Sequence, residues 1–235
     1  HGGSDYGATY NGRAEKDDNL KLALAVGDIL EKNGIDVVYT RTTDEYETPF
    51  KKATDANDSK ADYFVSIHRN SSPTPNQYTG VETLVYNNSG IKSQMAANIN
   101  SELEKAGFKN LGITERPNLV VLKRTKMPAV LVEASFINND KDNETFDKNF
   151  NQIANGIADD MLSTTVMACN KPVIISPAMN TKMYNNPILQ DNLDKLRRFG
   201  YEIVEPANGH LACGTSGAGK MPSEEVLVAH LERVI

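Results

Sequence analysis

The feature that most constrains the fold is a regular alternation of short apolar segments with longer amphipathic ones. Runs rich in β-branched residues end at polar or glycine-containing turns, and segments with apolar residues at helical spacing follow them. The expected strands are residues 35–39, 63–67, 81–86, 119–122, 129–133, 172–175 and 201–204. The expected helices are residues 17–33, 51–60, 91–106, 140–163, 188–199 and 223–234. Strands that alternate with helices predict an α/β architecture.

Length and charge narrow the functional classes. The 235 residues are enough for one large domain or two small ones. A net charge of -6 gives no electrostatic basis for binding nucleic acid. The longest apolar runs are far too short to span a bilayer. The chain opens directly on His1-Gly2-Gly3, so an upstream targeting segment could have been removed.

Cysteine usage restricts the kind of metal site that is possible. The two cysteines, Cys169 and Cys213, form no Cys-x-x-Cys pair, so a metal site must use histidines and carboxylates. His68 directly follows the expected strand 63–67, at the strand end where α/β proteins gather functional groups. His1 precedes two glycines, which permit a close backbone approach to an ion.

Two carboxylates complete the candidate set. Glu15 lies where the helix 17–33 is expected to begin, and Glu133 ends an apolar strand, which indicates a partly buried acid. Singly, each residue has an ordinary explanation. A histidine at a strand end is most often a hydrogen-bonded structural residue, and the helix dipole favours an acid in a first turn. A hydrolytic zinc site needs three nitrogen or oxygen ligands and a carboxylate that moves a proton.

Four motifs, in order along the chain, favour a zinc site over these ordinary structural explanations. They are His1-Gly2-Gly3-Ser4-Asp5-Tyr6-Gly7-Ala8, Glu15-Lys16-Asp17-Asp18-Asn19-Leu20, Ser66-Ile67-His68-Arg69-Asn70 and Met127-Pro128-Ala129-Val130-Leu131-Val132-Glu133. Together they resemble the zinc N-acetylmuramoyl-L-alanine amidases of the amidase 3 family. Arg41-Thr42-Thr43 and Ala61-Asp62 also lie where that family has similar residues. The resemblance covers residues 1 to about 160.

The resemblance implies a fold, a cofactor and a reaction. The fold would be a three-layer α/β sandwich, in which helices flank a mixed, mostly parallel central sheet. Zn²⁺ would be bound by His1, Glu15 and His68, and Glu133 would act as general base and then as general acid. The substrate would be peptidoglycan, cut between N-acetylmuramic acid and L-alanine by a secreted autolysin at the cell wall.

Some positions are expected to shape the substrate groove. Arg69 and Asn70 are candidate substrate contacts by the same resemblance. Arg69 stands where the family carries a small residue, so it is expected either to alter the groove or to point to solvent. Residues 71–78 and 110–117 are the expected groove walls. The family also has a strand immediately before its His-Gly-Gly motif, whereas this sequence begins at that motif.

The last third of the chain carries a second resemblance. Pro177-Ala178-Met179-Asn180-Thr181-Lys182-Met183-Tyr184 resembles the substrate-clamp motif of phosphopantothenoylcysteine decarboxylases, the flavin-binding enzymes of coenzyme A synthesis. Ala212-Cys213-Gly214-Thr215 resembles their second motif, with Thr215 where that family usually has aspartate. The match runs from about residue 153 to the end. By this resemblance Asn180 and Cys213 would be the functional contacts.

We interpret the chain as a chimera of the two families, joined in a shared helix near residues 155–163. Its domains would be residues 1–160 and a βαβα segment of flavoprotein type at 161–235. That segment lacks the half of the decarboxylase domain that builds most of the flavin site, so FMN is not expected. Residues 172–176 are a candidate extra strand for the first domain's sheet. The alternatives are a flavin- or phosphopantothenoylcysteine-binding fragment and an inactive structural chimera.

Overall fold

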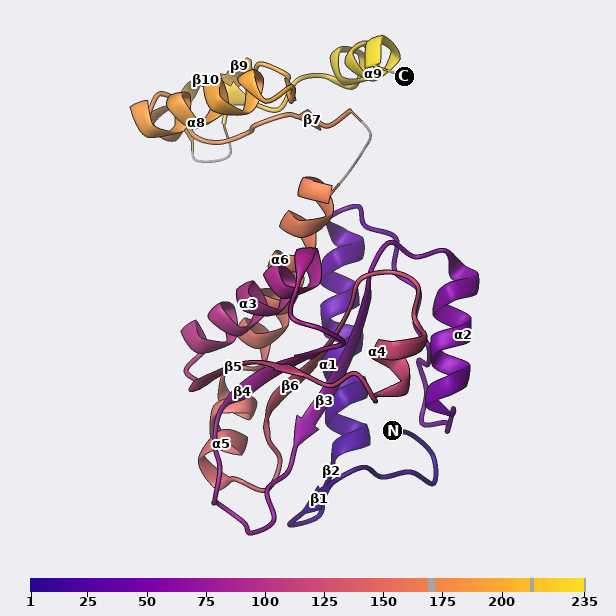
Figure 1. Cartoon of the computed structure of the whole chain (residues 1–235). Coiled ribbons are helices and arrows are strands. Elements are labelled where there is room, and N and C mark those ends of the chain that lie inside the picture. Colours follow the sequence, from indigo (N-terminus) through magenta and orange to yellow (C-terminus); the bar gives the residue numbers. More distant parts are fainter. Residues whose placement is uncertain (169–171, 212–213, 235) are drawn as a thin grey trace. The chain divides into compact units, whose positions relative to one another are not determined.

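The computed structural model describes residues 1–168, 172–211 and 214–234. The chain forms two compact units, His1–Thr165 and Val166–Ile235 (Figure 1). The predicted division after residue 160 falls inside α6 (Phe150–Ala168), a helix that continues through the boundary between the units.

A four-stranded sheet with the order β3-β6-β4-β5 forms the centre of the first unit. Its strands are β3 (Phe64–Asn70), β4 (Val81–Val85), β5 (Asn110–Glu115) and β6 (Ala129–Phe136). β3 runs parallel to β6, and β4 runs parallel to β5, whereas β4 and β6 are antiparallel. This mixed, mostly parallel sheet confirms the predicted fold class. A short hairpin of β1 (Thr9–Tyr10) and β2 (Arg13–Ala14) precedes the first helix.

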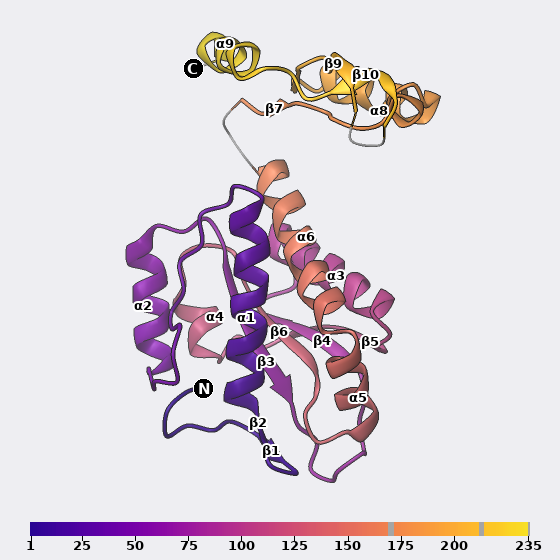
Figure 2. The same cartoon turned by 180° about the vertical axis from the view of Figure 1, so that it is seen from behind.

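Helices cover both faces of the sheet and give three layers (Figures 1 and 2). They are α1 (Glu15–Lys32), α2 (Pro49–Ser59), α3 (Gly90–Lys105), α4 (Val120–Arg124), α5 (Asp140–Lys148) and α6. Because side chains alternate along β6, Val130 and Val132 join the larger core formed with α1, α3 and α6. Leu131 joins the smaller core, formed with α2 and α4 on the opposite face.

Helix α1 positions the first carboxylate of the site. Leu22, Val26 and Leu30 recur every fourth residue and are buried in the larger core. The first turn is acidic and the last turn carries Lys32. Both charges interact favourably with the helix dipole and stabilise the helix. Glu15 is the first residue of this helix, so the helix fixes its backbone. Its side chain contacts His68 on β3, an edge strand of the sheet.

Two expected strands of the first unit are wrong. Residues 119–122 lie in helix α4 and its N-cap, and Val121 and Leu122 are buried in the smaller core. Residues 35–39 are extended but unpaired within the described chain. They keep a strand-like alternation, since Ile35 and Val37 pack on the larger core while Val38 is exposed.

The long helix expected over residues 140–163 is two helices, α5 and α6. Asn149 ends α5, and its side-chain amide donates to the Ala106 carbonyl at 2.8 Å, which ties the break to the end of α3. α6 then starts at Phe150, whose ring contacts Phe146 of α5 edge to face, with 5.7 Å between the ring centroids.

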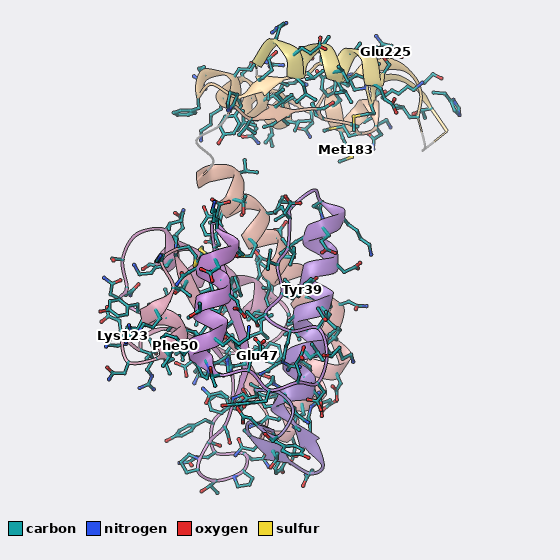
Figure 3. All side chains as sticks on the ribbon, turned by 90° about the vertical axis from the view of Figure 1, so that its right-hand side faces the viewer. Tyr39, Glu47, Phe50, Lys123, Met183 and Glu225 are labelled. Carbon is teal, nitrogen blue, oxygen red and sulfur yellow. The ribbon has the colours of Figure 1, made fainter. Side chains whose placement is uncertain are left out.

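The second unit contains two small sheets and three helices among its described residues. Its elements are β7 (Ile174–Ile175), α7 (Thr181–Tyr184), α8 (Pro187–Arg198), β8 (Glu202–Ile203), β9 (Ala207–His210), β10 (Ser216–Lys220) and α9 (Glu224–Val234). β7 pairs in parallel with β8 within the second unit. The addition of residues 172–176 to the first unit's sheet stays a prediction. Large apolar side chains reach the surface in both units, for example Phe50 on α2 and Met183 on α7 (Figure 3).

Arg69 corrects the sequence analysis, because it is buried, with 1% of its surface exposed. Its guanidinium lies 4.0 Å from the centre of the Phe146 ring, donates to Asn143 Oδ1 at 2.6 Å and forms an ion pair with Asp18. Burial lowers the pKa of Arg69 to about 10. Arg69 therefore does not point to solvent: it joins β3 to α1 and α5. Its contact with substrate stays a prediction.

We predict that Arg69→Met lowers the free energy of unfolding of the first unit by about 3 kcal/mol, because a buried ion pair and a cation–π contact are lost together. Lys32→Met, which removes an exposed pair with Asp28 on the same unit, should cost less than about 1 kcal/mol. Urea titrations followed by circular dichroism measure both values. Equal costs for the two variants would contradict the joining role of Arg69.

Candidate metal centre and active site

Three of the predicted residues meet at one place. The side chains of His1, Glu15 and His68 each offer a ligand atom, and these atoms lie within 4.8 Å of one another. His68 Nδ1 is 2.8 Å from Glu15 Oε1, and His1 Nε2 is 3.3 Å from Glu15 Oε2. The rings of His1 and His68 meet edge to face, with 5.2 Å between their centroids. Residues far apart in sequence therefore form one cluster of two imidazoles and one carboxylate.

The Glu15 carboxylate is the buried centre of this cluster, with 4% of the residue exposed. The Ala8 amide donates to Oε2 at 2.8 Å, and the Arg69 amide and Asn19 side chain donate to Oε1 at 3.3 and 3.2 Å. Burial opposes ionisation, but the hydrogen bonds from His1 and His68 hold the pKa of Glu15 well below its usual range. Glu15 is therefore an anion aimed at the two histidines.

In each histidine, the ring nitrogen that does not face Glu15 contacts a residue to which the sequence analysis gave no role. His1 Nδ1 is 2.8 Å from Asp5 Oδ2, and His68 Nε2 is 3.1 Å from Ser66 Oγ. Such outer contacts fix the orientation of a ligating imidazole and leave its other nitrogen facing the metal. Asp5 lies inside the first quoted motif, but only the backbone bridge between Gly2 and Asp5 shows that the motif folds back on itself.

Glu133 lies next to the cluster because of sheet register. It is the cross-strand partner of His68 on β3, and regular pairing stops just beyond, where Ala134 and Ser135 oppose Arg69 alone. Among the residues that the structure describes, its Oε2 atom is shielded from solvent and has no hydrogen-bond partner. Burial, and then the charges of Glu15 and Glu82, raise the pKa of Glu133 to about 8. A carboxyl group in this state can both accept and release a proton near neutral pH.

Asn70 lies on the same face but does not touch the cluster. Its side-chain amide donates to Glu82 Oε1 at 2.8 Å, and Glu82 is the partner of Glu133 on β4. The expected groove wall at residues 71–78 is hydrogen-bonded to Asn138, whose Oδ1 accepts from the Ser72 backbone amide at 3.0 Å. Most of the other expected wall is strand β5. Their contact with substrate stays a prediction.

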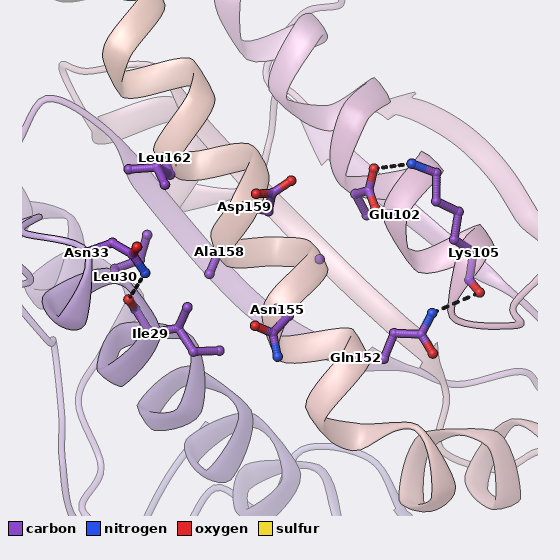
Figure 4. A pocket seen from close by; sticks show the side chains of 11 residues that line it. Ile29, Leu30, Asn33, Glu102, Lys105, Gln152, Asn155, Ala158, Asp159 and Leu162 are labelled. Carbon is purple, nitrogen blue, oxygen red and sulfur yellow. Dashed lines mark hydrogen bonds and ion pairs between the residues drawn. The ribbon is translucent and has the colours of Figure 1, made fainter. Parts of the chain in front are cut away.

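Two cavities lie away from these residues. One of about 330 Å³ lies between α1, α3 and α6 and is lined by Ile29, Asn155 and Asp159, among others (Figure 4). Ile29 is roughly 20 Å along α1 from Glu15, at 1.5 Å per residue. A second cavity, of about 520 Å³, lies at the start of α3. Neither of these two cavities is lined by the cluster or by Glu133. The side chains of His1 and His68 are 28% and 22% exposed, so the cluster can be reached from solvent.

Comparison with known proteins decides the family. Residues 1–163 match the family described as N-acetylmuramoyl-L-alanine amidase, and the match includes the cluster and Glu133. The chain belongs to this family. A crystal structure of an N-acetylmuramoyl-L-alanine amidase from Clostridium difficile 630 is 34% identical, with a TM-score of 0.66. The similarity covers 72% of this chain and 93% of that chain.

A curated relative of the amidase family agrees with this assignment. The sporulation-specific N-acetylmuramoyl-L-alanine amidase of Bacillus subtilis (strain 168) is 39% identical over 141 residues. The aligned region is 58% of this chain and 53% of the relative, so the chain spans about half the length of that amidase.

The C-terminal part matches a second family, described as Flavoprotein, over residues 149–235. The Coenzyme A biosynthesis bifunctional protein CoaBC of Bacillus subtilis (strain 168) is 46% identical over 82 residues, which are 35% of this chain and 20% of that protein. The chain thus spans about a fifth of that relative. The two family matches overlap at residues 149–163, which include the predicted junction, so a region of the amidase family is followed by a region similar to flavoproteins.

The flavoprotein-type residues are only partly visible. Asn180 is the N-cap of α7, where its Oδ1 accepts the Met183 amide at 2.9 Å. The side chain that the resemblance assigns to substrate thus has a local structural partner. Cys213 lies outside the described residues.

Gly7 provides a test of how closely the amidase cluster is packed. A Cβ atom at Gly7 would lie 2.5 Å from Glu15 Oε2 and 2.8 Å from the His1 ring, whereas a Cβ at Gly12 would meet nothing within 4 Å. Both glycines have positive φ, 65° and 79°, so alanine costs about 1–2 kcal/mol of backbone strain at either position.

We therefore predict that Gly7→Ala weakens Zn²⁺ binding at least about tenfold, because the new methyl group displaces the ligands. Gly12→Ala should bind Zn²⁺ within about twofold of the parent chain, since it carries the backbone strain without the collision. Competition with a chromogenic chelator measures both affinities. Similar losses in the two variants would show that backbone strain, not contact with the ligands, is responsible.

Proposed function

We propose that this protein is a zinc-dependent hydrolase that cuts the amide bond between N-acetylmuramic acid and L-alanine in peptidoglycan. The observation that carries the proposal is the His1–Glu15–His68 cluster, with Glu133 beside it, whose Oε2 atom has no hydrogen-bond partner among the described residues. Membership of the amidase family supplies the bond that is cut. By this proposal the chain has the amidase activity for which its relatives are named.

The cluster fits a catalytic zinc ion better than the alternatives. Two imidazole nitrogens and one carboxylate oxygen are a ligand set that catalytic zinc uses, with the remaining position left open. Ca²⁺ and Mg²⁺ favour oxygen ligands, and the described residues of the cluster include no cysteine. Zinc bound here would supply Lewis acidity that polarises the substrate carbonyl and favours ionisation of water. Asp5 and Ser66 would hold the two ligating rings in place.

Glu133 performs the proton transfers in this proposal. Its free Oε2 accepts the proton of the attacking water and then delivers it to the amide nitrogen, so the leaving peptide departs as an amine. The proton that Glu133 takes up in the first step is the one that it delivers in the second, and burial of the carboxyl group favours that uptake.

The setting follows from the substrate. Peptidoglycan is a polymer, and the partly exposed side chains of His1 and His68 leave the cluster accessible from solvent. We propose that the amidase unit acts at the cell wall, outside the cell. Among the residues that the structure describes, no helix has the length and apolar character needed to cross a membrane. For the second unit we propose no chemistry of its own, because the chain carries only a fragment of its flavoprotein relatives.

The first test is Glu133→Gln in the full chain, assayed on muramyl peptides. We expect turnover to fall by about 10²–10⁴-fold, the usual contribution of a general acid–base group, while bound zinc stays near one per chain. His68→Ala should lose the zinc as well as the activity. Glu144→Gln, an exposed carboxylate on α5, is the matched control and should retain activity.

The product identifies the bond. New alanine amino groups should appear without new reducing sugar ends. Release of reducing ends, or full activity of Glu133→Gln, would overturn the proposal.

Zinc binding should also depend on pH. A hydrogen bond to Glu15 raises the pKa of His1 to about 9, so the metal-free cluster carries a proton below that pH. Because zinc binds neutral imidazole, the metal must displace this proton, and affinity should rise by up to about tenfold per pH unit between pH 7 and 9. Calorimetry in Glu133→Gln, which removes the other group that titrates there, isolates the effect. An affinity that stays constant from pH 7 to 9 would contradict it.

A further inference from the structure

Three side chains stand side by side on neighbouring strands of the sheet. In the order β3-β6-β4, Glu133 is the register partner of His68 on one side and of Glu82 on the other. Residues directly opposite each other on paired strands project to the same face. Glu133 therefore lies between a proposed metal ligand and a second carboxylate, which the mechanism above does not use.

The Glu82 carboxylate is held in place but not neutralised. Oε1 accepts the Asn70 side-chain amide at 2.8 Å, and Oε2 accepts the Thr114 hydroxyl at 2.9 Å. A carboxylate has about four acceptor positions, so two remain. No ion pair with lysine, arginine or histidine is formed by Glu82 within the described residues. The side chain is half-buried, so it is fixed without being sealed from the site.

We propose that Glu82 is a substrate-binding residue that accepts a hydrogen bond from the N–H of the amide being cut and then holds the amine product. The inference rests on the proposed function. When the scissile carbonyl faces the His1–Glu15–His68 cluster on one side of Glu133, its nitrogen faces the other side, where Glu82 lies. The position of Glu82 in the row thus assigns it to the leaving group.

The chemistry of the reaction gives this carboxylate two partners in succession. Hydrolysis breaks the C–N bond, places the oxygen of water on the carbonyl carbon and adds a proton to the nitrogen. The amide N–H donates to Glu82 before the step, and the amine, which takes up a further proton in neutral solution, is a cation after it. A carboxylate binds both, and binds the charged product more strongly.

A purely structural role is the competing explanation, since Asn70, Glu82 and Thr114 also connect β3, β4 and β5. The two explanations differ in what they predict for substrates without an N–H. An ester analogue of the muramyl peptide, with oxygen in place of the scissile N–H, cannot donate to Glu82. A structural defect would lower the hydrolysis of amide and ester equally.

The experiment compares Glu82→Gln and Thr114→Val in the zinc-loaded full chain on the amide and its ester analogue. Glu82→Gln should lower kcat/KM on the amide about 10- to 100-fold, the effect of losing a hydrogen bond to a charged group, and on the ester less than about threefold. Thr114→Val, which removes a strand connection but keeps the carboxylate, should affect both substrates alike. Equal losses on amide and ester in Glu82→Gln, or no loss on the amide, overturn the proposal.

A binding measurement separates this proposal from the proposed function. If the parent chain releases no alanine amino groups from muramyl peptides, the proposed function fails whatever Glu82 does. Calorimetry with the amine L-alanyl-D-glutamate at pH 7 then tests Glu82 directly. The parent chain should bind the dipeptide about tenfold more tightly than Glu82→Gln. Equal affinities, or no binding by either protein, overturn the assignment.

Discussion

The arrangement of the site depends on one buried charge, the carboxylate of Glu15. A carboxylate removed from water costs several kcal/mol unless hydrogen bonds and opposite charges replace its solvation. The chain meets this cost from three directions: the N-terminal loop brings Ala8 and His1, β3 brings His68 and the Arg69 amide, and α1 brings Asn19. The burial of one side chain thus fixes the three segments that form the candidate metal centre.

Much of the candidate site could be predicted from the sequence, because its residues lie at the ends of regular helices and strands. His68 and Glu133 each follow an apolar run, and the side-chain alternation within those runs places both residues on the face opposite the larger core. Glu15 follows from the helix that begins at it. The family motifs added the roles. The alternating pattern also gave the α/β class, although it could not show which strands are neighbours.

The remaining features depend on contacts that no local pattern encodes. Arg69 looks like a surface residue in the sequence, and only Asp18 on α1 and Phe146 on α5 explain its burial. Residues 119–122 have strand-like composition but are helical, and their contact is the burial of Val121 and Leu122 in the smaller core. Asp5, Ser66 and Glu82 are ordinary polar residues until the fold places them against His1, His68 and Glu133.

The charges of the site link metal binding to the state of the general base. Glu15, Asp5 and Glu82 gather around the site, and without a metal their nearest compensation is the proton that His1 retains up to a pKa of about 9. That proton only partly offsets the acids, which is why burial and the charges of Glu15 and Glu82 still raise the pKa of Glu133 to about 8. A divalent cation at the cluster replaces one positive charge with two, and so lowers the pKa of Glu133. In the proposed mechanism, the same acidic surroundings that would attract a metal keep Glu133 protonated without it, and a bound metal would convert Glu133 to the base.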